Sequence, residues 1–171
     1  MERILLLTGR PGVGKTTALR RAAETVDAEV SGFYTEEIRQ RGRRTGFRAI
    51  PFGAGEAVTI AHVDVAGPRV SKYGVDVAAL DRVVEGTLGG DAGVWMIDEI
   101  GKMECFSEAF VERVRVLLDG DRPVVATVGR GGGLMVEVRN REDAETWEIT
   151  RGNRDAMPER IAARTREMTS G

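Results

Sequence analysis

Apolar positions along the chain follow two periods, and the alternation between them predicts strands that are followed by helices. Continuous apolar runs predict buried strands at residues 3–8, 94–97, 123–128 and 146–150. Helical spacing predicts one helix from Lys15 onward and others at residues 76–88, 107–118, 134–143 and 155–168. Strands separated by helices imply right-handed crossovers, so we expect an α/β fold with a mainly parallel sheet and helices on both faces.

Residues 30–50 interrupt this pattern with a different signal. Gly32-Phe33 and Gly46-Phe47 enclose a highly charged stretch, which indicates an added antiparallel hairpin with its turn near residues 40–43. We interpret the charges as a solvated tip. Residues 58–63 carry no clear pattern. No repeat, linker or low-complexity segment divides the 171 residues, so we expect a single domain over residues 1–171.

The loop between the first strand and the first helix, GRPGVGKT, matches the phosphate-binding pattern G-x-x-x-x-G-K-[ST]. Its glycines let successive amide groups point at a phosphate, and the helix that follows adds the positive end of its dipole. Lys15 is expected to reach the β- and γ-phosphates, and the Thr16 hydroxyl to bind Mg²⁺. Thr17 either touches the α-phosphate or faces solvent. The predicted nucleotide-binding residues are Gly9, Arg10, Pro11, Gly12, Val13, Gly14, Lys15, Thr16 and Thr17.

Two carboxylates, Asp98 and Glu99, follow the apolar run VWMI and supply an acidic half of the site. Such a pair often only caps the next element, but the phosphate loop favours a catalytic interpretation. Asp98 is expected to hold the metal and Glu99 to polarise the attacking water, so Glu99 and Lys15 are the predicted catalytic residues. The adjacent glutamate favours hydrolysis over kinase activity. It also predicts a further strand between the phosphate-loop strand and the acidic strand.

Composition adds candidates to this site. The basic side chains are 22 arginines and only three lysines, Lys15, Lys72 and Lys102. Arginine cannot replace a compact ammonium group against a phosphate, so all three lysines are candidates, although coding bias alone could leave Lys72 and Lys102. Thr127, at the end of a predicted strand, could sense the γ-phosphate or could be an ordinary β-branched strand residue. The candidates for a cation that stabilises the transition state are Arg130, Arg139, Arg141 and Arg154.

Charge and cysteine content exclude other classes of protein. A net charge of −2 argues against a nucleic-acid-coating protein, and the single cysteine, Cys105, argues against a disulfide framework. We therefore expect a cytoplasmic protein. No apolar run approaches the ~20 residues that a membrane-spanning helix needs, so no membrane partner is expected.

Several strings together resemble, from end to end, the small cancer-related nucleoside-triphosphatase family, P-loop proteins also described from thermophiles. They are GRPGVGKTT, GFYTEEIRQRGRRTGF, KYGVDV, DEIGKME, RNRED and GNRD, in this order. The resemblance implies a RecA-like three-layer fold that hydrolyses ATP, GTP and other nucleoside triphosphates to diphosphate and phosphate with magnesium and little base selectivity. It also implies that Lys102 belongs to the active-site region, and Lys72, Asn153 and Arg154 lie in the same strings. Cys105 and the short glycine-rich connection at residues 129–133 depart from the family pattern, so a lid could be altered here.

Two alternatives to hydrolysis stay open at this point. A small-molecule or nucleotide kinase would share the phosphate loop and the size, although no acceptor pocket or arginine-rich lid is evident in the sequence. A nucleic-acid-binding module is suggested by four arginines at the hairpin tip, but adjacent glutamates and the lack of interleaved aromatic residues argue against it. We expect a monomer whose substrates are ATP, GTP, CTP and UTP.

Overall fold

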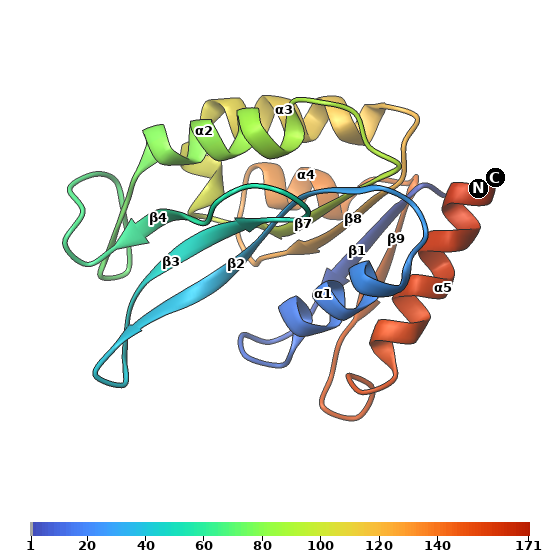
Figure 1. Cartoon of the computed structure of the whole chain (residues 1–171), viewed down its shortest axis with the longest axis horizontal. Helices are drawn as coiled ribbons and strands as arrows, with labels where there is room; N and C mark the ends of the chain where they lie inside the picture. Colours follow the sequence, from blue (N-terminus) through green and yellow to red (C-terminus); the bar gives the residue numbers. More distant parts are fainter. Residues whose placement is uncertain (1) are drawn as a thin grey trace.

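The computed structural model describes residues 2–171, in which nine strands form one sheet that is covered by five α-helices (Figure 1). The strands are β1 (Ile4–Thr8), β2 (Val30–Gln40), β3 (Arg43–Pro51), β4 (Val58–His62), β5 (Arg69–Val70), β6 (Tyr73–Val75), β7 (Val94–Ile100), β8 (Val124–Val128) and β9 (Ala144–Glu148). The helices are α1 (Lys15–Thr25), α2 (Val77–Leu88), α3 (Glu108–Asp119), α4 (Leu134–Arg139) and α5 (Met157–Ser170). A short 3₁₀ helix, η1 (Glu104–Phe106), precedes α3.

The parallel part of the sheet places the ends of three strands side by side. The strand order is β5-β6-β4-β3-β2-β7-β8-β1-β9, and every pairing from β2 to β9 is parallel. Strand β8 lies between β1 and β7, as the sequence predicts. Parallel strands end at one edge of a sheet, and ligands of open α/β sheets bind at that edge. The residues that follow β1, β7 and β8 therefore meet there.

The antiparallel part of the sheet is larger than the sequence predicts. Strands β2 and β3 form the expected hairpin, and β4, β6 and β5 extend the sheet beyond it through antiparallel pairings. Strands β5 and β6 span only two and three residues, which is too short to show a period. In β4 the buried Ile60 and Ala61 are adjacent in sequence, so alternation is lost there.

Both faces of the sheet are covered, which confirms the predicted three-layer α/β arrangement. Along β1, Ile4 and Leu6 pack with helices α2, α3 and α4, whereas Leu5 and Leu7 pack with α1 and α5 on the opposite face. Figure 1 shows the same division of the helices between the two faces. Because β1 is buried on both faces, it appears in the sequence as a continuous apolar run rather than an alternating one.

Local caps explain where several helices begin and end. The Asp76 carboxylate accepts a hydrogen bond from the Ala79 amide at 3.0 Å and starts α2, and Ser107 does the same for α3 through Phe110. The predicted helix at 134–143 ends early, at Arg139, because residues 140–143 form a turn in which Arg141 pairs with Asp143. Among residues 2–171, no helix combines the length and the apolar character needed to cross a membrane.

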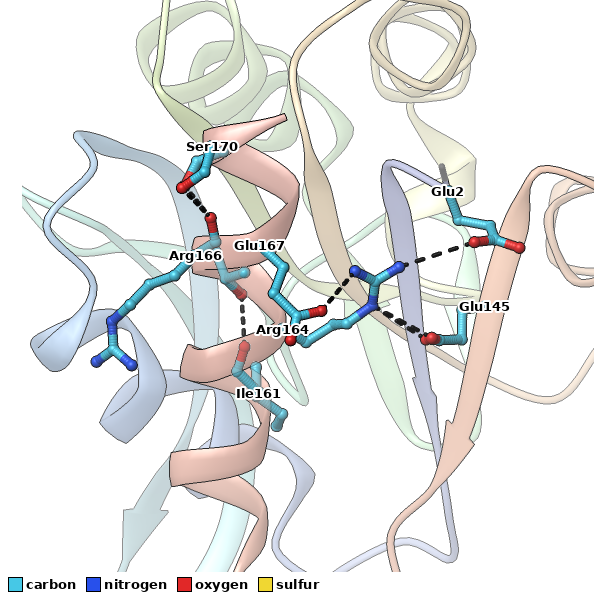
Figure 2. Close-up of polar contacts among 9 residues, drawn as sticks. Glu2, Glu145, Ile161, Arg164, Arg166, Glu167 and Ser170 are labelled. Atoms are coloured by element: carbon cyan, nitrogen blue, oxygen red, sulfur yellow. Dashed lines mark hydrogen bonds and ion pairs between the residues drawn. The ribbon is translucent and has the colours of Figure 1, made fainter.

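The last helix, α5, is tied to the parallel sheet through one arginine (Figure 2). The Arg164 guanidinium lies 3.2 Å from the Glu145 carboxylate on β9 and 3.8 Å from Glu2, which precedes β1. It also pairs with Glu167 on its own helix at 3.1 Å. The anchored helix begins after the loop at residues 149–156, which lies against the phosphate loop.

Candidate functional site

The phosphate loop connects β1 to α1 in the geometry that the motif requires. Gly14 has a left-handed backbone, with φ +115°, at the position before the first residue of α1, so the turn into the helix favours glycine there. Gly9 (φ +152°) packs so closely that an added Cβ would lie 2.6 Å from the Ile149 carbonyl oxygen. The Lys15 ammonium group donates a hydrogen bond to the Gly9 carbonyl at 2.8 Å. The lysine is thus held across the mouth of the loop.

A cluster of hydroxyl groups surrounds the Asp98 carboxylate at the end of β7. The Thr16 hydroxyl, on the first turn of α1, donates to Asp98 Oδ2 at 2.8 Å. The Thr127 hydroxyl, from β8, donates to Oδ1 at 2.6 Å. Thr35, from β2, donates to Oδ2 through its amide at 3.2 Å and its hydroxyl at 3.3 Å. Four elements therefore converge on one carboxylate, and they include the predicted Thr16, Asp98 and Thr127.

The donor set around Asp98 fits a magnesium ion. Its side chain is only 3% exposed, and among residues 2–171 it forms no ion pair with a lysine or arginine. A buried carboxylate without a cationic partner is costly unless a cation or hydrogen bonds compensate it. Magnesium binds proteins through one or two oxygen ligands and completes its shell with water and phosphate oxygens. Asp98 and Thr16 present such a pair.

Glu99, the next residue, lies beside this cluster in an environment that favours its neutral form. Burial raises the pKa of the Glu99 carboxyl, the nearby Asp98 charge raises it further, and Lys15 opposes both effects. A raised pKa brings a carboxylate closer to the operating range of a general base. Glu99 borders the glycines at 101 and 129, where an added Cβ would approach its Oε1 within 2.7 and 3.3 Å. The Glu99 carboxylate therefore packs closely against both glycines, and a side chain at either position would crowd it.

Three cavities surround the phosphate loop. The central cavity, about 460 Å³, is lined by Lys15, Thr16, Thr17, Arg44, Asp98 and Glu99. The apolar cavity, about 320 Å³, is lined by Phe47, Ile60, Val70, Met103, Glu99 and Glu104. The outer cavity, about 520 Å³, lies between residues 10–13 of the loop and residues 148–151. The central and apolar cavities share Lys15 and Glu99, so the two predicted catalytic residues stand at their junction.

The loop between β9 and α5 brings Arg154 to the phosphate loop and places Asn153 behind the residues that line the outer cavity. The Arg154 guanidinium donates to the Val13 carbonyl at 3.3 Å, and its side chain packs 3.7 Å from the position of a Cβ on Gly14. The Asn153 side chain accepts from the Thr150 amide at 2.8 Å and donates to the Glu148 carbonyl at 2.9 Å. Asn153 therefore shapes the outer cavity, and Arg154 braces the loop.

The two remaining lysines have different positions. Lys102 is exposed and lines the apolar cavity, on the same side as Glu99. Lys72 is exposed on the outer strands, with its ammonium group 5.6 Å from the centre of the Tyr73 ring, and it lines none of the three cavities. The structure thus brings Lys102 to the candidate site and leaves Lys72 outside it.

Of the four arginines that the sequence suggests, the structure places Arg130 and Arg154 near the site and Arg139 and Arg141 away from it. The Arg139 guanidinium donates hydrogen bonds to the carbonyls of Gly129 and Gly131. Arg141 forms ion pairs with carboxylates that lie outside the cavities. Arg130 lines the apolar cavity. Arg44, at the base of the hairpin tip, lines the central cavity together with the Asp98 cluster. It is the arginine that sequence reasoning missed.

Arg44 is held in place by two partners. Its Nε donates to the Tyr73 hydroxyl at 2.8 Å, and its Nη1 pairs with the Glu37 carboxylate at 3.1 Å. Arg39 pairs with the same carboxylate at 2.9 Å. The Glu37 carboxylate thus neutralises part of the positive charge that the sequence places at the hairpin tip. Both arginines are exposed, but only Arg44 lines the central cavity.

Glu104 is a second buried carboxyl that the sequence did not single out. It is 4% exposed, and burial raises its pKa well above the ordinary value of 4.5, with a further contribution from the nearby Glu99 charge. The only signal for Glu104 in the sequence is its position as the last residue of the string DEIGKME. Its burial depends on η1 folding back over the end of β7, which no local pattern predicts.

The raised pKa of Glu104 predicts a pH dependence of stability. The folded chain holds a proton that the unfolded chain releases above about pH 4.5, so the free energy of unfolding should fall as pH rises through the raised pKa. The slope for one proton is at most about 1.4 kcal/mol per pH unit. Glu104→Gln should remove this contribution. Urea unfolding of both proteins between pH 4 and 8 measures it, and a difference that does not change with pH would contradict the assignment.

Comparison with known proteins gives consistent matches along the chain. A family model described as NTPase matches residues 4–162. Nucleoside-triphosphatase THEP1 of Natranaerobius thermophilus is 38% identical over 173 residues, which covers 97% of this chain and 98% of that protein. The cancer-related nucleoside-triphosphatase of Homo sapiens is 36% identical over 178 residues, with 92% and 93% covered.

Solved structures agree with the sequence matches. The crystal structure of THEP1 from the hyperthermophile Aquifex aeolicus superposes with a TM-score of 0.84 at 34% identity and covers 95% of this chain and 98% of that one. The solution structure of the human cancer-related nucleoside triphosphatase gives a TM-score of 0.80 at 36% identity, with 96% and 98% covered. The matches span nearly the whole length of each protein, and the chain therefore belongs to this nucleoside-triphosphatase family.

Proposed function

We propose that the chain hydrolyses nucleoside triphosphates to nucleoside diphosphate and phosphate in a magnesium-dependent reaction at the central cavity. The observation that carries this proposal is the position of Glu99, beside the Thr16–Asp98 pair and at the junction with Lys15. The names of the relatives, which describe nucleoside-triphosphatases, support the reaction class. In this proposal Lys15 binds the β- and γ-phosphates, and Thr16 and Asp98 hold the metal.

The proposed step is an attack of water on the γ-phosphorus. The water oxygen bonds to the γ-phosphorus while Glu99 accepts a proton from the water. The bond between the γ-phosphorus and the β–γ bridging oxygen breaks. Magnesium would neutralise charge on the β- and γ-phosphate oxygens. Lys15 donates a hydrogen bond to the Gly9 carbonyl in this structure, and on nucleotide binding it would donate to phosphate oxygens instead. Thr127 and Thr35 keep the Asp98 carboxylate oriented.

We further propose that the outer cavity accepts the base with little selectivity. The cavity lies on the far side of residues 10–13 and is bordered by Glu148, Ile149, Thr150 and Arg151. Among residues 2–171, no aromatic side chain lines it, so no ring is available there to stack on a base. ATP, GTP, CTP and UTP are therefore all expected as substrates.

The direct test of this function is a turnover profile for the four nucleotides with and without Mg²⁺. We expect phosphate release from each nucleotide, with kcat/KM values within about one order of magnitude of each other. A tenfold difference corresponds to about 1.4 kcal/mol, less than a dedicated hydrogen-bonding site provides. Chelation of the metal should abolish release. Turnover that is unaffected by chelation, or confined to one base, would contradict the proposal.

Arg44 is proposed as the cation that stabilises the developing charge, because it enters the central cavity from the hairpin. Arg44→Ala should lower kcat roughly 10- to 100-fold, because a positioned cation stabilises developing negative charge and the exposure of Arg44 keeps the effect below that of a buried donor. Tyr73→Phe should lower kcat less, because Arg44 would keep its Glu37 partner. Arg43→Ala, a change at the exposed neighbour outside the three cavities, is the control. Equal kcat in the Arg44 and Arg43 variants would exclude the role.

A further inference from the structure

The apolar cavity lies directly next to the place where the γ-phosphate is proposed to bind. It shares Lys15, Thr35 and Glu99 with the central cavity. A molecule in the apolar cavity would therefore face the same phosphorus and the same carboxylate as the attacking water.

The size and the walls of the cavity do not suit water as its natural occupant. Its volume of about 320 Å³ is roughly ten times the ~30 Å³ that one water molecule takes up in the liquid, and it lies at the lower end of the range of small-molecule sites. Phe47, Ile60, Val70 and Met103 give it mainly apolar walls. The first three come from β3, β4 and β5, the antiparallel strands that extend the sheet beyond the parallel core.

Two carboxyl groups meet at the polar end of this cavity. A Cβ placed on Gly101 would lie 2.7 Å from Glu99 Oε1 and 2.9 Å from Glu104 Oε1, so both groups face the space next to this glycine. Burial raises the pKa of Glu104 well above its ordinary value, so Glu104 can donate a hydrogen bond at this end of the cavity. Glu99 lines both the apolar and the central cavity, so its carboxylate is placed to accept a proton from a molecule in either one.

We propose that the apolar cavity binds a small alcohol with a mainly apolar body, which accepts the γ-phosphoryl group in place of water. The alcohol oxygen bonds to the γ-phosphorus, the bond to the β–γ bridging oxygen breaks, and the hydroxyl proton passes to Glu99. The products are a nucleoside diphosphate and a phosphate monoester. This inference rests on the nucleotide site of the proposed function and adds a second substrate to it.

The test is phosphoryl transfer from γ-labelled ATP to a defined panel: benzyl alcohol, 2-phenylethanol, cyclohexanol and 3-methylbutanol, with glycerol as a polar comparison. We expect at least one of the four apolar alcohols to yield a labelled phosphate monoester in competition with free phosphate, and glycerol to yield none. Release of labelled phosphate without any ester from the apolar alcohols would overturn this inference alone. Absence of both products would overturn the proposed function as well.

A cavity-filling variant connects the activity to the apolar cavity. Val70 lies on β5, is half-buried and lines the cavity, so Val70→Trp should reduce the ratio of ester to free phosphate at least tenfold. Val136→Trp, on the exposed face of α4 and outside the cavity, is the matched control and should leave the ratio unchanged. An equal ratio in the two variants would show that transfer occurs elsewhere.

Discussion

Glu99→Gln should lower kcat for phosphate release by about 10²- to 10⁴-fold, the usual contribution of a positioned general base. Glutamine keeps the shape of the side chain and can still hydrogen-bond water, but it cannot accept the proton. In the wild-type protein, kcat should fall as the pH is lowered, because Glu99 becomes protonated. Its pKa is raised, so this fall should begin above pH 4.5. The variant should lose this acid limb. Steady-state phosphate release between pH 4.5 and 8 measures both effects.

Two controls separate this result from a general loss of structure. Nucleotide affinity should stay within a few fold, because Lys15 and the loop amides are unchanged. Glu145→Gln makes the same exchange at a partly buried glutamate that pairs with Arg164, away from the three cavities, and should leave kcat intact. A Glu99→Gln protein that retains wild-type kcat would exclude Glu99 as the base.

Asp98→Asn should reduce hydrolysis by roughly 10²- to 10³-fold and raise the Mg²⁺ concentration needed for half-maximal rate. The exchange removes the charge that would hold the metal. It also replaces one carboxylate oxygen, either the one that accepts from Thr127 or the one that accepts from Thr16 and Thr35, with an amide nitrogen that donates. Hydrolysis rates measured over a Mg²⁺ titration report the change. An unaltered Mg²⁺ requirement would contradict the metal role of Asp98.

Thermal stability distinguishes a metal effect from unfolding in this variant. Asp98 is 3% exposed, so removal of its charge relieves a cost of burial, but the loss of an acceptor oxygen weakens hydrogen bonds from Thr127 or from Thr16 and Thr35. Because the two effects oppose each other, we expect Tm without ligand to change by only a few degrees. Asp81→Asn provides a matched control, because Asp81 also accepts a hydroxyl hydrogen bond, from Ser107 at 2.6 Å, but lies outside the cavities. Its hydrolysis should match wild type.

The parallel half of the fold could be predicted because its signals are local. Each buried strand of that half, such as β1 or β8, is a short apolar run, and α1 and α2 show helical spacing. The antiparallel extension could not be predicted in the same way. Strand β6 pairs with β4, and β5 pairs with β6, so both depend on these pairings rather than on their own two or three residues.

In the candidate site, too, the residues in contiguous motifs could be predicted, and those positioned by long-range pairing could not. The phosphate loop and Asp98-Glu99 are contiguous motifs, and the structure brings them together at the carboxyl ends of β1 and β7. Thr35, Arg44 and Glu104 were missed because their positions depend on the register of β2 with β7, on the pairing of β2 with β3, and on the path of η1. The scarcity of lysine made Lys15, Lys72 and Lys102 site candidates, and in the structure Lys15 and Lys102 line the cavities whereas Lys72 does not.

Hydrolysis in ¹⁸O-labelled water shows whether water activated at Glu99 attacks the γ-phosphorus. Mass spectrometry of the products reports which bond breaks. We expect one ¹⁸O atom in each released phosphate and none in the nucleoside diphosphate, at a rate that Glu99→Gln reduces by at least about 10²-fold. Label in the diphosphate, or release of pyrophosphate, would contradict it.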